Sequence, residues 1–385
     1  MKDLLKQRRK EFLNDVIGGR EAAEVDIVVL THVLPDRPEL LEALARLGRI
    51  ASVIAIPYSV DEEVYRLLQT NYNIQRPSLG QLRSRRYLVD LIRAAYRQRP
   101  IVISEIGGYF ADALDDLKRI LGAHLLGVVE DTEQGHRAYE SRTRLPCPVI
   151  SIARSRLKHA EDSLVGASCL FSTERLLRDL GFLLEPRRSL VLGYGRVGCG
   201  IAHALQRRQC PTLVYDLDPV KRVVALGEGF AVPERHAALR QADIVFGATG
   251  RTSIVEMDFP HLNNGVILAS CSSKDVEFDL EALRSAYSMT LVEPGICKLE
   301  REGKHLYLLA DGRPVNFLDS AVIGPVLSLT HAEIIVAIAE LIHAPCVLGA
   351  CEATLREIDD MRKQELAKSW LEHFCDSVTG HYRQA

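Results

Sequence analysis

The sequence predicts an α/β protein built from two doubly wound domains, because two series of short apolar runs each alternate with amphipathic helical stretches. The first series fills the N-terminal part of the chain, and the second begins near residue 188. A helical stretch at about 161–180 separates them, and a helical pattern returns from about 331 to the end. We therefore expect the second domain to be inserted into the first, which the C-terminal helices complete.

Each apolar run is expected to be a parallel strand, since the helical stretch after it supplies the crossover that parallel pairing requires. The first series predicts strands at 26–30, 52–56 and 101–103, with helices at 37–47 and 61–69. The second predicts a strand at 189–192, a helix at 197–208, a strand at 212–215, and a strand with its turn at 242–250. The first domain then covers 1–168 and 326–366, the second covers 169–325, and residues 367–385 form a C-terminal tail.

Composition narrows the classes of function. The chain has 385 residues, and its 48 basic and 51 acidic side chains leave a net charge of −3. A protein that holds nucleic acid through a broad basic surface is therefore disfavoured. The most apolar late segment, 334–348, is interrupted by charged and proline residues and is too short to span a bilayer. We expect neither a nucleic-acid partner nor a membrane partner.

The cysteines indicate a reducing compartment. There are nine of them, an odd number, and they are scattered without a Cys-x-x-Cys pair or a histidine pair at zinc spacing. A disulfide framework and a structural metal site are both disfavoured by this pattern. The N-terminus alternates charges and lacks the apolar stretch of a secretory signal. We expect a cytoplasmic protein without a bound metal.

A glycine motif is the strongest single indication of chemistry. The run GYGRVG at 193–198 directly follows a predicted strand and opens a predicted helix. Gly193 and Gly195 allow a tight turn and the close approach of a diphosphate, and Gly198 lets the helix pack on the strand. Asp216 ends the next strand, where its carboxylate can bind the ribose hydroxyls of NAD and repel the 2′-phosphate of NADP. The alternative is a glycine-rich turn in an α/β domain without a cofactor.

Further motifs in the same order resemble the S-adenosyl-L-homocysteine hydrolase family. They are GYGRVGCG at 193–200, YDLDP at 215–219, FGATG at 246–250, KDVEFD at 274–279, PVN at 314–316, RLKHAEDSLVG at 156–166, EDTEQG at 130–135, His32, and HYR at 381–383. The resemblance implies a substrate domain at 1–168 and 326–366, an NAD domain at 169–325, and an oligomerisation tail. It also implies a homodimer or homotetramer.

The resemblance implies an unusual use of tightly bound NAD. Members of this family transiently oxidise the 3′-hydroxyl of a nucleoside ribose, and the resulting ketone acidifies the proton on C4′. A group on C5′ then leaves, water adds, and the ketone is reduced again without net redox change. Such a site has to orient the ribose and exclude water from a reactive intermediate.

By the same resemblance, particular residues receive roles. Lys158 acts on the proton of the 3′-hydroxyl and Asp162 binds the ribose hydroxyls, with an exposed helical ion pair as the alternative for both. His32 lies near the 5′ side of the sugar, unless it is an ordinary hydrogen-bonded histidine. Asp131 lies near the ribose, unless it is a plain loop carboxylate. Asp36 takes the position of a glutamate at the adenine edge.

The remaining expected contacts are to the cofactor. Tyr382 corresponds to a tyrosine that closes over the NAD of a neighbouring subunit, although Val378 stands where the family has a lysine and a frayed terminus is the alternative. Arg222 lies beyond Asp216 and, with Lys221, weakens the preference for NAD. The residues expected to bind the cofactor are Gly193, Gly195, Arg196, Val197, Gly198, Asp216, Lys221, Thr132, Gln134, Ser163, Thr249, Gly250, Asn316 and Tyr382.

Departures from the family fall on the nucleoside side. Ser273 stands at one family histidine, and the histidine between Gly324 and Pro325 is absent. The family aspartate beside C4′ is replaced by Ile106, with Glu105 adjacent, and we expect Glu105 and Ser273 to face the substrate. The glycine turn, Asp216 and Lys158 keep the residues that the family has at these positions.

The resemblance and these departures together favour an NAD-dependent enzyme of the nucleoside 5′-dehydratase type, in which water is the leaving group, or a variant hydrolase. One alternative is a genuine S-adenosylhomocysteine hydrolase. Another is a catalytically silent protein that binds NAD and acts as a partner of other proteins.

Overall fold

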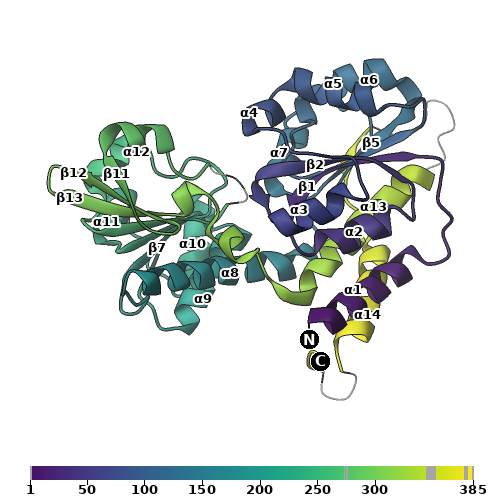
Figure 1. The fold of residues 1–385 in the computed structure, drawn as a ribbon. Coiled ribbons are helices and arrows are strands. Elements are labelled where there is room, and N and C mark those ends of the chain that lie inside the picture. The colour runs from purple at the N-terminus through teal and green to yellow at the C-terminus, as the bar shows by residue number, and fades with distance from the viewer. Residues whose placement is uncertain (1, 273, 275, 344–352, 377–379, 384–385) are drawn as a thin grey trace. The chain divides into compact units, whose positions relative to one another are not determined.

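The protein is described by a computed structural model that covers residues 2–272, 274, 276–343, 353–376 and 380–383. The chain forms two compact units. Unit 1 combines residues 1–158 with residues 324–385, and unit 2 comprises residues 159–323. The units therefore divide at 158/159 and 323/324, where the sequence analysis places the boundaries at 168/169 and 325/326. As predicted from the alternation of apolar runs and helices, both units are α/β, with helices on the faces of a sheet (Figure 1).

Unit 1 contains a seven-stranded sheet in the order β14-β6-β5-β4-β1-β2-β3, and all of its strand pairs are parallel. The strand order reverses between β1 and β4, because β2 lies on the far side of β1. In open parallel sheets, ligands bind beyond the carboxyl ends of the strands at such a reversal. The strands are β1 Asp26–Val33, β2 Arg49–Val60, β3 Ile74–Gln75, β4 Ile101–Glu105, β5 Leu125–Glu130, β6 Val149–Ser151 and β14 Leu355–Arg356.

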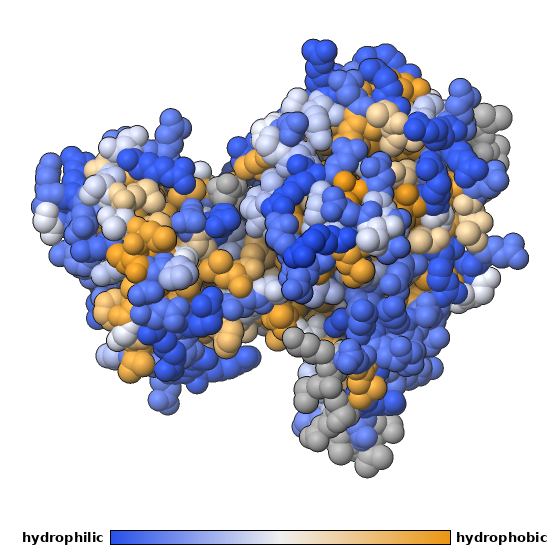
Figure 2. Space-filling view, in the orientation of Figure 1, coloured by the Kyte–Doolittle hydropathy of each residue, from blue (hydrophilic) through white to orange (hydrophobic). Residues whose placement is uncertain are grey.

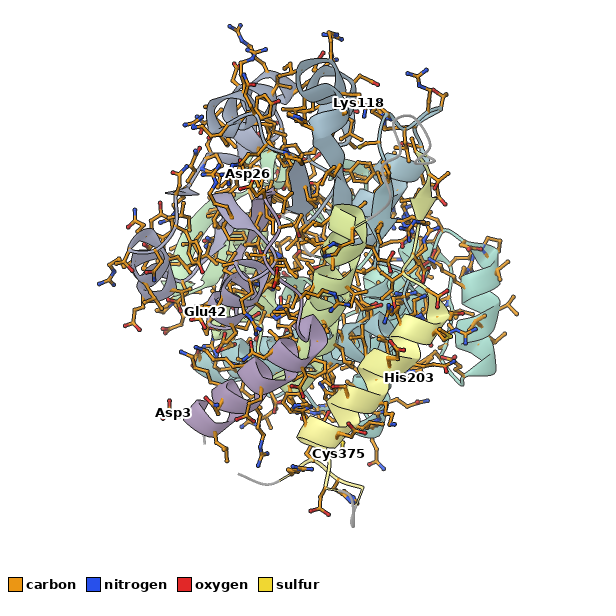
Figure 3. The ribbon with its side chains drawn as sticks, turned by 90° about the vertical axis from the view of Figure 1, so that its right-hand side faces the viewer. Asp3, Asp26, Glu42, Lys118, His203 and Cys375 are labelled. Carbon is orange, nitrogen blue, oxygen red and sulfur yellow. The ribbon has the colours of Figure 1, made fainter. Side chains whose placement is uncertain are left out.

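Helices cover the sheet of unit 1, and their apolar faces form its core together with the strands. They are α1 Lys2–Ile17, α2 Arg37–Leu44, α3 Glu62–Gln69, α4 Leu79–Leu82, α5 Arg85–Ala95, α6 Leu114–Leu121, α7 Glu133–Glu140, α13 Leu327–His343 and α14 Asp360–Phe374. Figure 3 shows α1 and α14 side by side, with Asp3 on α1 and Cys375 just after α14. Asp26, at the buried start of β1, is paired with Arg49 at 2.6 Å.

Helix α13 is the most apolar helix of unit 1. The segment Gly324–His343 is 20 residues long and apolar enough to cross a membrane by length and composition alone, although 334–348 was expected to be too short and too polar. Of its most apolar window, 78% is buried, and α13 packs on β4 and β5. A buried core helix meets the same two criteria, because both environments favour apolar side chains on all faces.

The C-terminal part of the chain differs from the helical pattern expected beyond residue 331. The short strand β14 interrupts it and pairs in parallel with β6, so the chain returns to the sheet before α14 begins. A two-residue strand is too short for its apolar period to be visible in the sequence. Beyond α14, the backbones of Cys375 and Tyr382 form an isolated antiparallel β-bridge.

Unit 2 contains a second seven-stranded sheet in the order β11-β12-β13-β10-β9-β7-β8. The strands from β13 to β8 pair in parallel, and β11 and β12 extend the sheet in antiparallel fashion. The order reverses between β7 and β9. The strands are β7 Ser189–Leu192, β8 Thr212–Tyr215, β9 Ile244–Gly247, β10 Val266–Ser270, β11 Ser288–Glu293, β12 Ile296–Arg301 and β13 Lys304–Leu309.

The helices of unit 2 connect these strands and leave one apolar face exposed. They are α9 Arg196–Arg207, α10 Pro219–Gly227, α11 Arg235–Gln241 and α12 Leu280–Ala286, and α8 Lys158–Asp179 leads into the unit. The strands at 189–192 and 212–215 have the predicted bounds, and α8 and α9 lie within three residues of theirs. Apolar residues reach the visible surface of this unit (Figure 2). Exposed apolar residues lie on α10 and the turn before it, namely Leu217, Val220, Val223, Val224 and Leu226.

Candidate functional site

The glycine turn of unit 2 has the geometry of a phosphate cradle. Gly193 follows β7 with φ of +93°, and a Cβ there would lie 2.6 Å from the carbonyl oxygen of Ala248. A Cβ on Gly198 would lie 1.9 Å from the carbonyl oxygen of Gly193, so the helix touches the turn. Gly195 is the N-cap of α9, and a Cβ there would meet no atom within 4 Å. The helix therefore begins with no side-chain cap and with open space beside it, which suits an anionic diphosphate.

Asp216 is held at the end of β8 by the same turn. Its carboxylate accepts hydrogen bonds from the backbone amides of Tyr194, at 2.6 Å, and Asp218, at 2.9 Å. Lys221 lies 3.6 Å from it, whereas Arg222 is engaged with Glu234 at 2.7 Å. The carboxylate is thus fixed beside the cradle, where it can still bind hydroxyl groups with its remaining lone pairs. Arg222, which weakened the expected preference for NAD, is occupied by another acid.

A buried carboxylate that the sequence analysis did not single out shapes the next loop. Glu277 is fully buried and accepts hydrogen bonds from the amides of Thr249, at 2.7 Å, and Gly250, at 2.6 Å. It also accepts the hydroxyl of Thr249 at 2.9 Å and that of Ser272. Thr249 and Gly250 follow β9, so Glu277 orders the loop at the reversal point of the sheet. The signal in the sequence is an acid between Val276 and Phe278, where an apolar residue is expected in a buried segment.

The other expected cofactor residues of unit 2 are spread over its helices and loops. Arg196 and Val197 begin α9, and Ser163 is exposed on α8, where a Cβ on Gly200 would meet its backbone at 2.8 Å. Asn316 is buried on a short 3-10 helix, Val315–Asp319. Ser273, expected to face the substrate, lies outside the described residues.

Unit 1 contains a buried ion pair at the carboxyl edge of its sheet. Lys158, the first residue of α8, donates a hydrogen bond of 2.6 Å to Oδ1 of Asp131, which follows β5. Both side chains are about nine-tenths buried. Although burial opposes it, the attraction and hydrogen bond of Lys158 hold the pKa of Asp131 below its ordinary value. The acid is therefore charged at neutral pH.

Lys158 and Asp162, which lie four residues apart on α8, each have a charged partner from another part of the chain. Asp162 lies in unit 2, where its carboxylate is 3.3 Å from the guanidinium of Arg196 in the glycine turn. Lys158 is in unit 1 with Asp131. Their spacing of four residues places both on one helical face, and the charged partner of each lies in the same unit as the residue itself. Asp162 therefore lies beside the cofactor cradle of its own unit.

His32, at the end of β1, is buried and neutral. Its Nδ1 atom is hydrogen-bonded to the hydroxyl of Ser59 on β2. Burial, together with the positive charge of Arg37, lowers the pKa of His32 to about 3. The imidazole is thus a hydrogen-bonding group at neutral pH, and it carries no proton to donate as a cation.

Asp36 and its neighbour form a buried charged group with helix α13. Nη1 of Arg37 lies 2.8 Å from Nε2 of His331, and the same Nε2 lies 3.2 Å from Oδ2 of Asp36. Burial raises the pKa of Asp36, but Arg37 and His331 more than offset it, so the pKa is lowered overall. Asp36 was expected to bind the substrate, whereas its neighbour Arg37 and the distant His331 were not expected at this site. In the sequence, the only indication of this group is that Arg37 comes shortly after the end of the first predicted strand.

Glu105 has a different task from the expected one. It is buried at the end of β4, and its carboxylate accepts hydrogen bonds from the amides of Tyr109, at 2.6 Å, and Phe110, at 3.1 Å. The hydroxyl of Tyr139 also donates to it. The prediction that Glu105 faces the substrate is therefore corrected: its carboxylate ties down the loop after β4. Ile106 beside it is buried as well.

Glu130, at the end of the neighbouring strand β5, also holds the loop after β4 through its carboxyl group. It pairs with Glu105 across β4 and β5, and it accepts the amides of Gly107 and Gly108, each at 2.9 Å. The amide and hydroxyl of Thr132 also donate to it, at 2.6 and 2.8 Å. Burial and the charge of Glu105 raise the pKa of Glu130 to about 8, so it keeps its proton at neutral pH.

The remaining expected residues lie in unit 1. Thr132 caps α7 by accepting the amide of Gly135 at 3.1 Å, so its hydroxyl is used twice within the protein. Gln134 is half-buried in the first turn of that helix. Tyr382 is 53% exposed and packs edge-on against Trp370 of its own chain. Thr132 and Gln134 therefore belong to the unit of Lys158, and the glycine turn belongs to the other.

No group of three or more His, Cys, Asp or Glu side chains that could hold a metal ion occurs among the described residues. The buried polar groups of unit 1 lie at the carboxyl ends of β1, β4 and β5, next to the strand reversal. A site of this kind can orient a polar ligand and move a proton at it, since it combines fixed charges with little water.

Comparison with known proteins agrees with this division of the chain. The sequence profile described as "S-adenosyl-L-homocysteine hydrolase, NAD binding domain" matches residues 171–322. An adenosylhomocysteinase of Sulfolobus acidocaldarius is 29% identical over 301 residues, which cover 76% of this chain and 71% of that protein. One of Pyrococcus abyssi is 27% identical over 82% of this chain and 75% of its own. An S-inosyl-L-homocysteine hydrolase of Methanopyrus kandleri is 30% identical over 51% of this chain and 48% of its own.

Proposed function

Since this chain belongs to the S-adenosyl-L-homocysteine hydrolase family and carries its NAD-binding domain, we propose that it is an enzyme that transiently oxidises the 3′-hydroxyl of a nucleoside. The oxidation drives elimination or addition at C5′, with water as the leaving group in a 5′-dehydration. The observation that carries the proposal is the buried pair of Lys158 and Asp131 at 2.6 Å, beside the strand reversal of unit 1.

The residues of unit 2 supply what a dinucleotide needs. The uncapped start of α9 at Gly195 suits the diphosphate, and the fixed carboxylate of Asp216 suits a ribose diol. Bound NAD accepts a hydride from a carbinol carbon, which is the chemistry that no side chain provides. The carboxylate of Asp216 would repel a 2′-phosphate, so NAD is favoured over NADP.

The residues of unit 1 would handle the proton of the reacting hydroxyl. Lys158, when it has lost its own proton, can take the proton of the 3′-hydroxyl, and Asp131 stabilises the ammonium group that results. Neutral His32 orients a hydroxyl by hydrogen bonding and adds no charge. Burial of all three side chains keeps water from the oxidised sugar.

The experiment is incubation of the purified protein with adenosine, inosine and other nucleosides in heavy water. We expect exchange of the C4′ proton and a transient NADH absorbance for the true substrate. Lys158→Ala should abolish both signals while leaving NAD bound, because Lys158 lies outside the NAD-binding unit. Bound cofactor without either signal, for every nucleoside, would instead indicate a catalytically silent NAD-binding protein.

The second candidate is a genuine thioether hydrolase, which the names of the relatives favour. Because one relative is named an S-inosyl-L-homocysteine hydrolase, the base of the substrate could be a 6-oxopurine as well as adenine. Release of homocysteine from S-adenosylhomocysteine or S-inosylhomocysteine distinguishes this candidate from a dehydratase. The absent family histidines at Ser273 and between Gly324 and Pro325 support the dehydratase, because they change the groups expected around C5′.

We further propose a homodimer or homotetramer that works in the cytoplasm. The exposed apolar side chains around α10 are a surface that association would bury, and their removal from water would contribute to stability. Light scattering of the purified protein measures the number of subunits. Val220→Glu and Val223→Glu together should shift the mass toward the monomer if α10 lies in the interface.

A further inference from the structure

One residue of the glycine turn has a side chain that can anchor it. Tyr194 stands between Gly193 and Gly195, and its side chain is buried in the core of unit 2. The ring packs edge-on against Phe230, with 5.9 Å between the ring centroids. The glycines on both sides have no side chain that could fix the backbone. The position of the turn therefore depends on what holds Tyr194.

The hydroxyl of Tyr194 is held by Glu228, which follows α10. It donates a hydrogen bond to Oε2 of Glu228. On α9, Nε2 of His203, which is labelled in Figure 3, lies 3.1 Å from the same oxygen. The side-chain amide of Gln206, on the same helix, donates to the carbonyl oxygen of Glu228 at 3.3 Å. The helix that begins at the glycine turn thus fixes the acceptor, and the acceptor fixes the turn.

The phenol of Tyr194 keeps its role as a donor. Burial, together with the hydrogen bond to Glu228, raises the pKa of Tyr194 above its ordinary value. The hydroxyl is therefore protonated at neutral pH.

The backbone of Tyr194 acts on the acid that suits the ribose. Its amide donates to Oδ2 of Asp216 at 2.6 Å, and the amide of Asp218 donates to Oδ1 at 2.9 Å. One backbone donor on each oxygen fixes the orientation of the carboxylate and leaves lone pairs for the hydroxyls of a ribose. Loss of the Tyr194 donor would let the Asp216 side chain rotate.

We propose that Tyr194 and Glu228 are positioning residues for Asp216, and that their hydrogen bond sets the preference of the cradle for NAD over NADP. The inference rests on NAD binding in unit 2 and is independent of the nucleoside chemistry proposed for unit 1. A fixed carboxylate repels a 2′-phosphate, whereas a carboxylate that is free to rotate can turn away from it. Lys221, 3.6 Å from Asp216, would then face the phosphate without the opposing charge.

Calorimetric titration of NAD and NADP into the full-length protein, stripped of nucleotide, tests the proposal. In Tyr194→Phe the ring still packs, but the hydroxyl is absent. We expect the ratio of NAD affinity to NADP affinity to fall about fivefold, as for the loss of one hydrogen bond. Glu228→Ala should have the same effect. Glu228→Gln removes the same charge but keeps an acceptor oxygen, so it should retain the wild-type ratio.

Hydrogen exchange of the nucleotide-free protein reports on the turn itself. The amide at position 194 should exchange faster in Tyr194→Phe and Glu228→Ala than in the wild-type protein, and at the wild-type rate in Glu228→Gln. Tyr287→Phe is the matched control, because Tyr287 is also buried in unit 2 and packs edge-on against Phe259 at 5.7 Å. It should change neither readout.

The outcomes separate this inference from the cofactor assignment. If the wild-type protein prefers NAD and Tyr194→Phe keeps the same ratio of affinities, the role of Tyr194 and Glu228 is overturned and NAD binding stands. An equal loss of affinity for both dinucleotides gives that result, since it indicates a general loosening of the unit. A ratio that falls without faster exchange at position 194 overturns the role as well. If the wild-type protein binds neither dinucleotide, the assignment of NAD to unit 2 fails and this inference fails with it.

Discussion

The ammonium group of Lys158 lies 2.6 Å from Oδ1 of Asp131, although 27 residues separate the two in the chain. The contact joins the start of α8 to the end of β5, and it is buried. Removing one partner of a buried pair leaves the other charge without compensation. We expect Lys158→Ala to lower the free energy of unfolding by about 3 kcal/mol.

Urea denaturation of Lys158→Ala, Asp131→Asn and the double variant measures the coupling. The double variant should be more stable than the sum of the single effects implies, because it leaves no unpaired charge. Arg93→Ala is the control, since Arg93 and Asp90 form an exposed pair. Additive losses in the double variant would show that the two side chains do not stabilise each other.

Two glycines of the turn should respond differently to alanine. At Gly195 the added Cβ meets no atom, so Gly195→Ala should fold normally but lower the affinity for NAD about tenfold or more by filling the cradle. At Gly198 the Cβ would lie 1.9 Å from the Gly193 carbonyl oxygen, so the helix has to shift. We expect Gly198→Ala to cost about 2 kcal/mol of stability.

Calorimetric titration with NAD and thermal unfolding of both variants separate binding from folding. Equal NAD affinity in Gly195→Ala and the wild-type protein would contradict the placement of the diphosphate at the start of α9.

Glu277 should be needed for the loop that follows β9. Its Oε1 atom accepts the amides of Thr249 and Gly250, and its Oε2 atom accepts the hydroxyl of Thr249, so in Glu277→Gln a side-chain NH₂ replaces one of these two acceptor oxygens. We expect this variant to lose about 2 kcal/mol of stability and to bind NAD more weakly. Hydrogen exchange at the Gly250 amide should accelerate. Glu281→Gln, at an exposed position of α12, is the control and should show none of these changes.

The buried imidazole of His32 should make stability depend on pH. Its pKa is about 3 in the folded protein and 6.5 in the unfolded chain, so the unfolded chain binds a proton first as the pH falls. This contribution is complete above pH 6.5 and is lost toward pH 3. Between pH 8 and pH 5 it should remove about 2 kcal/mol from the free energy of unfolding.

His32→Asn should flatten this part of the stability profile, as measured by urea denaturation at several pH values. Ser59→Ala removes the hydrogen bond but keeps the imidazole buried, so it should retain the slope. An unchanged slope in His32→Asn would assign the pH dependence to other groups.

Much of the fold could be predicted from local pattern. The strands at 189–192 and 212–215 and the helix that starts near Arg196 are each specified by a continuous run of residues, and the structure confirms them. The short strand β14 was not predicted, because two residues are too few to show the alternation of apolar and polar side chains that indicates a strand. The order of the strands also lies outside local pattern, since it depends on which runs pair across the sheet.

The sequence by itself determined the α/β class, the glycine turn with Asp216, and which positions hold a titratable or charged residue type. These depend on neighbours within a few positions, where spacing and residue type suffice. The tertiary structure alone decided the partners. It joined Lys158 to Asp131 and Asp162 to Arg196, gave Glu105 to the loop after β4, and brought Glu333 of α13 to Ser155. Those contacts span long stretches of chain and follow from the packing of strands and helices, and the protonation of each group is decided by burial, which no local pattern specifies.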